Sequence, residues 1–152
     1  MWGEKGRDTM TTSESAVAAF FRTYDRLNAG GDIAATVALF AEVFLAAGTQ
    51  GAQCVRAADF ARALPKRKEL FASLGCTGTK LVGLEETALD ARYTLARTQW
   101  SFSLEGESRE RREVVLASTF LVDVGGAEPR IVLYLSHQDP VAALRGAAVE
   151  QA

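Results

Sequence analysis

The spacing of apolar residues changes near the middle of this chain, and no other feature of the sequence constrains the fold more. Apolar residues recur at helical spacing up to about Gly75 and at strand spacing from about Thr79 to His137. A chain with its helices first and a run of long hairpin strands after them is typical of the α+β class. We therefore predict an α+β domain whose helices cover one face of a curved sheet.

Composition predicts a single globular domain. The chain has 152 residues, of which 48% are hydrophobic and 24% are charged. A chain of this length can bury roughly 70% of the surface that its unfolded state exposes, so one core suffices without disulfides. The 17 basic and 19 acidic residues give a formal charge of -2 and are not gathered into a basic face, which excludes nucleic acid as an expected partner.

The start of the chain carries no targeting pattern. Residues 1–15 are polar and lack an apolar core, and no run approaches the length of a membrane-spanning helix. We therefore expect a cytoplasmic protein without membrane contact, with residues 1–12 as a flexible segment. Cys54 and Cys76 should remain reduced thiols there. Because the chain has no CxxC pair and one His, these cysteines are expected to be ordinary small apolar residues, and no metal site is expected.

Three helices and a small hairpin are predicted for the first half. Thr11 and Glu14 have capping-box spacing ahead of a helix of about four turns. Asp32 caps a second, shorter helix. A hairpin and a third helix follow, and a kink or a division into two helices is expected at Pro65. The apolar stripe of the first helix is Val17, Phe20, Phe21, Tyr24 and Leu27; the hairpin spans 43–55 and the third helix 58–75.

The strands of the second half are apolar on both faces. Trp100 and Phe102 lie on one parity of the second long strand, and Tyr93 and Leu95 lie on the other. A sheet that is apolar on both faces must be covered twice. Three helices suffice for one face, so we expect a second copy of the chain on the other, as a homodimer. The predicted strands run over 81–89, 92–104, 114–124 and 130–138; the domain spans 13–139, and 140–152 is expected to be a loose or weakly helical tail.

Three motifs, in this order, resemble the NTF2-like superfamily and its ketosteroid isomerase-like and SnoaL-like branch. They are LNAGGD at 27–32, VALFAE at 37–42 and RIVLYLSHQD at 130–139. The resemblance implies a cystatin-like cone, with three N-terminal helices on a curved, mostly antiparallel sheet and a pocket between them. It also implies dimers formed through the outer sheet face. It implies no single activity, because the same cone hosts isomerases, cyclases, dehydratases, hydrolases and non-catalytic binding domains.

The catalytic groups of ketosteroid isomerase do not appear at the positions that the resemblance assigns to them. Those enzymes use an Asp base, with a Tyr and a protonated Asp as hydrogen-bond donors. The position of the Tyr is occupied here by Thr23, one residue before Tyr24. The position of the Asp base is occupied by Ala47 or Gly48, and that of the protonated Asp by Ser118. Without a carboxylate base, that mechanism of proton transfer has no support in this sequence.

The same alignment predicts which side chains line the cone. They form an aromatic wall with a few hydroxyl and amide groups, as expected for a site that binds a small, mostly apolar molecule. An equal alternative is that these side chains meet and fill the cone as ordinary core. The expected ligand-binding residues are Phe20, Tyr24, Thr98, Trp100, Phe102, Ser118, Phe120, Tyr134, Ser136 and Gln138.

Three residues are candidates for catalysis. Tyr24 can close the cavity from the first helix. Glu85 has the parity that pairs with Trp100 and so can reach into the cone, where burial would raise its pKa. The simpler interpretation is a carboxylate that is solvated or paired with Arg97 or Arg92. His137, the one imidazole, has the parity opposite to the inward residues, which favours a capping or interface role at the outer face or strand end.

Two functions remain open at this stage. One is binding of a small, mostly apolar molecule without catalysis and without a cofactor. The alternative is a cofactor-independent isomerase, cyclase or dehydratase that acts on a polyketide-like or steroid-like substrate. It requires one of the three catalytic candidates inside the cone, within hydrogen-bond reach of another polar group. An assembly module without any ligand is a minor third option.

Overall fold

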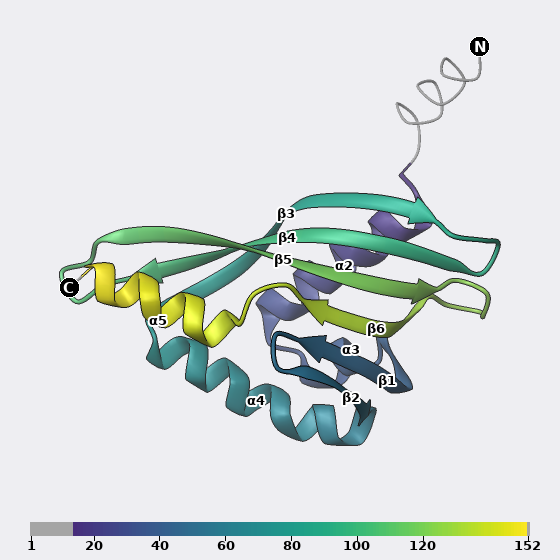
Figure 1. Ribbon diagram of the computed structural model, residues 1–152, viewed down its shortest axis with the longest axis horizontal. Helices are drawn as coiled ribbons and strands as arrows, with labels where there is room; N and C mark the ends of the chain where they lie inside the picture. Colours follow the sequence, from purple (N-terminus) through teal and green to yellow (C-terminus); the bar gives the residue numbers. More distant parts are fainter. Residues whose placement is uncertain (1–13, 152) are drawn as a thin grey trace, which may run out of the picture.

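The computed structural model describes residues 14–151, so the predicted flexible segment and Thr11 lie outside the described residues. The elements follow the predicted order of helices first and long strands after (Figure 1). They are α2 (Ala16–Gly30), α3 (Ile33–Val37), β1 (Phe40–Gly48), β2 (Gly51–Arg56), α4 (Ala57–Ser73), β3 (Cys76–Ala88), β4 (Tyr93–Glu105), β5 (Arg111–Asp123), β6 (Arg130–Ser136) and α5 (Pro140–Gln151).

Helix α2 begins and ends where local chemistry favours a boundary. The Ser15 hydroxyl accepts a hydrogen bond from the Ala18 backbone N–H at 2.9 Å. Gly31 ends the helix at a φ of +74°, a left-handed conformation that glycine adopts without a steric cost. Between these caps the predicted apolar stripe is buried except for Leu27, which is half-buried, and its aromatic residues form one side of the core.

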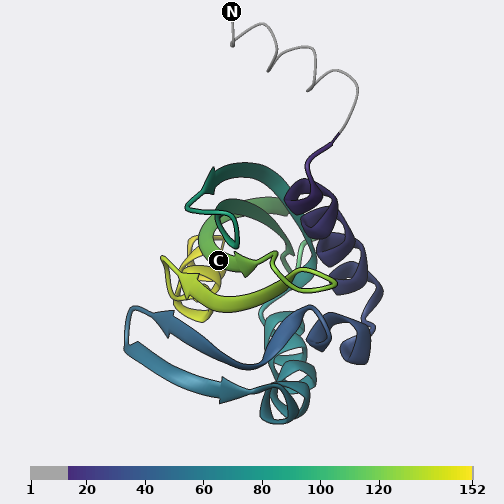
Figure 2. The same ribbon diagram turned by 90° about the vertical axis from the view of Figure 1, so that its right-hand side faces the viewer.

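The strands form one curved, unclosed sheet in the order β2-β1-β6-β5-β4-β3. All neighbours are antiparallel except β1 and β6, which run parallel. Figure 2 shows β3, β4 and β5 curling strongly, with α2 along one side and α4 below. The prediction of an α+β cone with three N-terminal helices on a mostly antiparallel sheet is confirmed.

Helix α4 is continuous across Pro65, so of the two predicted alternatives, a kink or a division into two helices, the division does not occur. A proline inside a helix removes one backbone hydrogen bond and costs about 3 kcal/mol. Leu64 beside it is buried, and Phe60 and Phe71 pack against the core on either side. We attribute the continuity of α4 to these contacts, which anchor the helix before and after the proline.

The C-terminal segment, predicted to be a loose or weakly helical tail, is a helix that packs on the domain. The Asp139 carboxylate caps α5 by accepting a hydrogen bond from the Val141 backbone N–H at 3.0 Å. Leu144 is 0% exposed and Ala147 is also buried. Arg112 of β5 donates to the Ala147 carbonyl at 3.2 Å. The sequence did not indicate this packing, because the small residues of α5 form no distinct apolar stripe. None of the helices within residues 14–151 is long and apolar enough to cross a bilayer.

Strand β3 contains two extra residues, Thr77 and Val82, and the second changes the face of every side chain that follows it. Leu81 pairs with Trp100, but Gly83 pairs with Gln99, so Val82 has no partner of its own. Such a bulge shifts the alternation of a strand by one residue. Residues of β3 after Val82 therefore point to the face opposite to the one that simple alternation predicts.

The outer face of the sheet carries a row of leucines that runs across neighbouring strands. The strand register places these residues side by side on β1, β6, β5 and β4. All of them are at least partly exposed. No helix within residues 14–151 covers this face. The row consists of Leu45, Leu133, Leu121 and Leu95.

Candidate functional site

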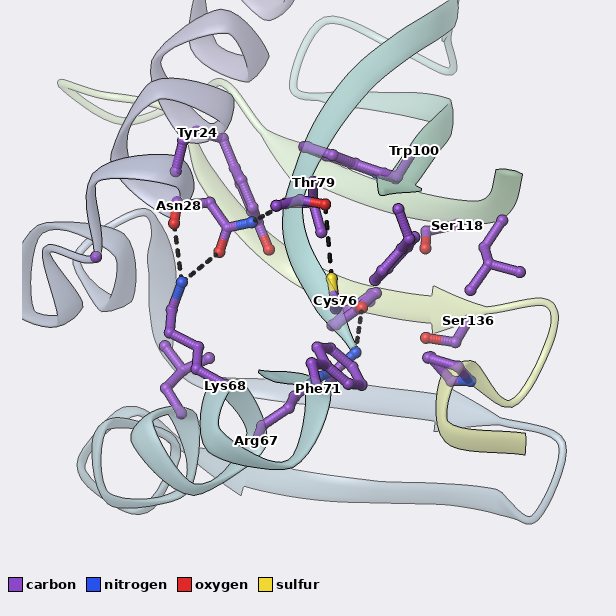
Figure 3. Close-up of a pocket in the computed structure, with 18 of the residues that line it drawn as sticks. Tyr24, Asn28, Arg67, Lys68, Phe71, Cys76, Thr79, Trp100, Ser118 and Ser136 are labelled. Atoms are coloured by element: carbon purple, nitrogen blue, oxygen red, sulfur yellow. Dashed lines mark hydrogen bonds between the residues drawn. The ribbon is translucent and has the colours of Figure 1, made fainter. Parts of the chain in front are cut away.

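A cavity of about 360 Å³ lies between α2, α4 and the inner face of the sheet (Figure 3). Its walls contain most of the side chains predicted from strand alternation, so the cone is not completely filled by its core. Whether these residues bind a ligand remains a prediction. The predicted residues that line the cavity are Tyr24, Trp100, Phe102, Ser118, Phe120, Tyr134, Ser136 and Gln138.

Phe20 and Thr98, also predicted to bind a ligand, do not line the cavity. Phe20 is buried in the core with its ring edge-on to Phe21, at a centroid distance of 5.2 Å. Thr98 is 1% exposed. Its hydroxyl accepts a hydrogen bond from the Trp100 indole N–H at 2.8 Å and donates to the Ser118 carbonyl at 2.9 Å. Thr98 thus fixes the position of the Trp100 indole in the cavity wall by a hydrogen bond.

The aromatic wall is a contiguous set of rings. The rings of Phe120 and Tyr134 are stacked with centroids 4.9 Å apart and an interplanar angle of 10°. Tyr24 reaches both the sheet and the helices, with its ring 5.4 Å from that of Trp100 and 5.8 Å from that of Phe120. Contacts of this kind stiffen the wall and leave its cavity side apolar.

Helix α4 contributes a cation to the cavity, Arg67, which is not among the predicted site residues. The Arg67 guanidinium lies 5.2 Å from the Phe71 ring centroid and 5.9 Å from that of Tyr134. Its Nη2 donates to the Tyr134 hydroxyl at 3.3 Å. A signal was present in the sequence: Arg67 lies three residues after Leu64 and four before Phe71, on the apolar stripe of α4.

The neighbouring Lys68 is committed to backbone and amide oxygens. Its ammonium donates to the Asn28 carbonyl at 2.8 Å and to the Asn28 side-chain oxygen at 3.2 Å. The Asn28 amide in turn donates to the Thr79 hydroxyl at 2.9 Å. These bonds tie α4 to the end of α2 and to β3 at one side of the cavity. Burial, and next the charge of Arg67, lower the pKa of Lys68.

Arg67 separates the acidities of the two phenols in the wall. Burial raises the pKa of Tyr24 far above its ordinary value of 10.0, Tyr134 adds to this effect, and Arg67 opposes it. Burial opposes ionisation of Tyr134 too, but there the charge of Arg67, together with hydrogen bonding from Ser136, Arg67 and Ser118, outweighs it. The pKa of Tyr134 is therefore lowered, and Tyr134 is the more acidic phenol of the site.

Two of the three catalytic candidates lie outside the cone. Because of the bulge at Val82, Glu85 pairs with Arg97 on the outer face, so the expectation that it shares the inner face of Trp100 is wrong. His137 lies on the outer face as its parity predicts, with Nε2 2.6 Å from the Thr119 hydroxyl. Tyr24 alone of the three lines the cone.

The lining of the cavity contains no aspartate or glutamate among the described residues. Ser118, at the position that the resemblance assigns to the acid of ketosteroid isomerases, does line the cavity. Ala47 and Gly48, at the position of the base, line a second cavity of about 780 Å³ between the β1–β2 hairpin and α4. Arg67 and Tyr134 border both cavities. Within residues 14–147, no three His, Cys, Asp or Glu side chains gather as metal ligands would.

Comparison with solved structures identifies the fold. An NTF2-like protein with a cystatin-like fold from Novosphingobium aromaticivorans superposes with a TM-score of 0.67 at 16% identity, over 95% of this chain and 96% of the other. The chain has the NTF2-like fold. A ketosteroid isomerase-like protein from Erwinia carotovora atroseptica, at 13% identity, covers 80% of this chain and 92% of its own with a TM-score of 0.60.

Other similar structures carry different descriptions. A candidate polyketide cyclase from Xanthomonas campestris pv. campestris has 18% identity and a TM-score of 0.56, over 83% of this chain and 94% of the other. No protein-family model matches the sequence, and no curated protein matches it. Likeness at this level of identity establishes the NTF2-like architecture and leaves the activity to be argued from the site.

Proposed function

We propose that this protein binds a small, mostly apolar molecule in the cone and does not use the ketosteroid isomerase mechanism. One observation carries the proposal: an open cavity of about 360 Å³ with an aromatic wall whose described lining lacks any carboxylate. Sites of this size that are mostly apolar, with a few convergent polar groups, are typical of small-molecule binding. The absent carboxylate removes the group that would take a proton from carbon.

Trp100 provides a direct test, because its indole forms part of the wall. In a Trp2→Phe background, Trp100 is the one tryptophan of the chain. Titration with a panel of bicyclic and tricyclic apolar molecules should change its fluorescence saturably, and native mass spectrometry should count the bound ligand. Ser136→Phe, which fills the cavity, should abolish binding, whereas Ala91→Phe at an exposed turn should not. Equal binding by both variants would contradict the proposal.

A second candidate function, proton-transfer catalysis by the same cavity, is favoured by the contact between Arg67 and Tyr134. A phenol whose pKa is lowered by a neighbouring cation donates its proton more readily than an ordinary tyrosine. Incubation of each bound molecule in deuterated water separates the two functions. Binding alone leaves the recovered molecule unlabelled, whereas catalysis exchanges a carbon-bound proton or changes the mass, and Tyr134→Phe should stop it.

We further propose that the protein acts in the cytoplasm as a homodimer formed through the outer sheet face. Support comes from the leucine row on that face, which is at least partly exposed, and from Val43 beside it, which is 51% exposed. The two cysteines, both free thiols, fit a reducing compartment. Light scattering should give twice the monomer mass, and Leu133→Asp should yield monomers, whereas Glu107→Lys, at an exposed loop, should not.

A further inference from the structure

The cavity presents a positive charge without a negative partner. Arg67 forms no ion pair with a carboxylate among the residues whose side chains the structure describes. One of its N–H groups donates to the Tyr134 hydroxyl, and a guanidinium has five. A charge placed against apolar surface without a partner is costly, and a bound anion would offset that cost.

The other charged groups near this position are already occupied. Lys68 donates to two oxygens of Asn28. Asp139 is close enough to act on the pKa of Arg67, but its carboxylate caps α5 through the backbone N–H groups of Val141 and Ala142. Arg67 is therefore the charged group of the wall that is available to a ligand.

The surroundings of Arg67 indicate which anion would fit. The guanidinium lies between two aromatic rings and borders an apolar cavity, and its planar fork matches a carboxylate through two parallel hydrogen bonds. The Tyr134 hydroxyl accepts from Arg67 and keeps its own proton to donate to the same anion. The Arg67 guanidinium and the Tyr134 hydroxyl together can bind a single carboxylate, and the aromatic rings can contact an apolar group attached to that carboxylate.

We propose that the ligand of this cavity is a monocarboxylic acid with an aromatic or alicyclic body, and that Arg67 and Tyr134 bind its carboxylate. The apolar body then lies against Trp100, Phe120 and Phe71. This inference rests on the proposed binding function and adds the chemical class of the ligand to it.

Matched pairs of acids and their neutral amides test the inference. The probes are 2-naphthoic acid with 2-naphthamide and benzoic acid with benzamide, measured at pH 7.5 by the Trp100 fluorescence change and by calorimetry. A charge-assisted hydrogen bond lost from a pair of this kind corresponds to roughly a 10- to 100-fold change in affinity. We expect the acid of each pair to bind tighter than its amide by about this factor.

Variants in α4 test whether Arg67 causes the preference for acids over amides. Arg67→Gln should abolish the preference for acids while keeping the affinity for amides. Arg67→Lys, which keeps the charge but not the planar fork, should retain a reduced preference. Lys66→Gln is the matched control, because it removes one charge from an exposed position on the same helix, outside the cavity lining, and should behave as the wild type.

The outcomes separate this inference from the binding function on which it rests. If amides bind as tightly as acids in the wild type, or if Arg67→Gln and Arg67→Lys both keep the full preference, the carboxylate site is refuted and the binding function stands. If none of these probes nor any member of the apolar panel binds the wild type, both are refuted.

Discussion

Replacing Thr98 with valine tests how the aromatic wall is held. Thr98 is 1% exposed, and its hydroxyl is the acceptor for the Trp100 indole N–H at 2.8 Å. Valine has nearly the same shape but no acceptor, so the substitution leaves the indole N–H without its partner inside the sheet. An unpaired buried donor costs about 1–3 kcal/mol. We expect Thr98→Val to lower the free energy of unfolding by about 2 kcal/mol, or roughly 4–8 °C in Tm.

The assay is urea unfolding followed by circular dichroism and by Trp100 fluorescence in the Trp2→Phe background. Thr94→Val is the matched control: Thr94 lies on the same strand and the same parity and is 7% exposed, but its hydroxyl makes no hydrogen bond with another described side chain or backbone group. Thr94→Val should lower the free energy of unfolding clearly less than Thr98→Val does. Thr94→Val should leave the emission spectrum of Trp100 unchanged, whereas Thr98→Val should shift that spectrum. If the two variants lose the same free energy and have the same emission spectrum, the role assigned to the Thr98 hydroxyl is wrong.

Two further predictions address the C-terminal helix and the buried phenol. Leu144→Ala should lower the free energy of unfolding by about 3 kcal/mol, because it leaves a cavity at a fully buried site. Arg145→Ala, at the exposed neighbouring position, should change this free energy little. Equal small losses in the two variants would mean that α5 does not pack on the domain in solution. Since burial raises the pKa of Tyr24 above 10.0, its stabilising effect is complete below pH 10 and falls at higher pH, by about 1.4 kcal/mol per pH unit. Tyr24→Phe should therefore lose less stability than the wild type between pH 10 and 11.5 in urea unfolding, and identical slopes would contradict this.

The opposing pKa directions of Tyr24 and Tyr134 connect the fold to the site. Both phenols are buried in the same wall, and the charge of Arg67 on α4 lowers the pKa of both, but only at Tyr134 does it, together with hydrogen bonding, outweigh burial. Tyr134 accepts a hydrogen bond from Arg67, whereas Tyr24 lies against the core rings of α2 and the sheet. Arg67, together with the Tyr134 hydroxyl, thus forms a polar position in the otherwise aromatic wall of the cavity.

Local sequence signals determined the elements and most of the wall. The Asp32 cap starts α3 as predicted, and the alternation of side chains along β4, β5 and β6 places Trp100, Ser118 and Tyr134 on the inner face. These features depend on neighbours a few residues away in the chain, so they can be predicted without knowing the tertiary structure.

Only the tertiary structure decided three features of the site. The bulge at Val82 depends on how β3 pairs with β4, and it moves Glu85 to the outer face. The docking of Leu144 depends on the surface that β5 offers to α5. That Arg67 forms no ion pair with a carboxylate among the residues whose side chains are described depends on which segments, distant in sequence, meet around α4. Pairing, docking and charge environment are set by contacts between remote parts of the chain, and periodicity along one segment carries no information about them.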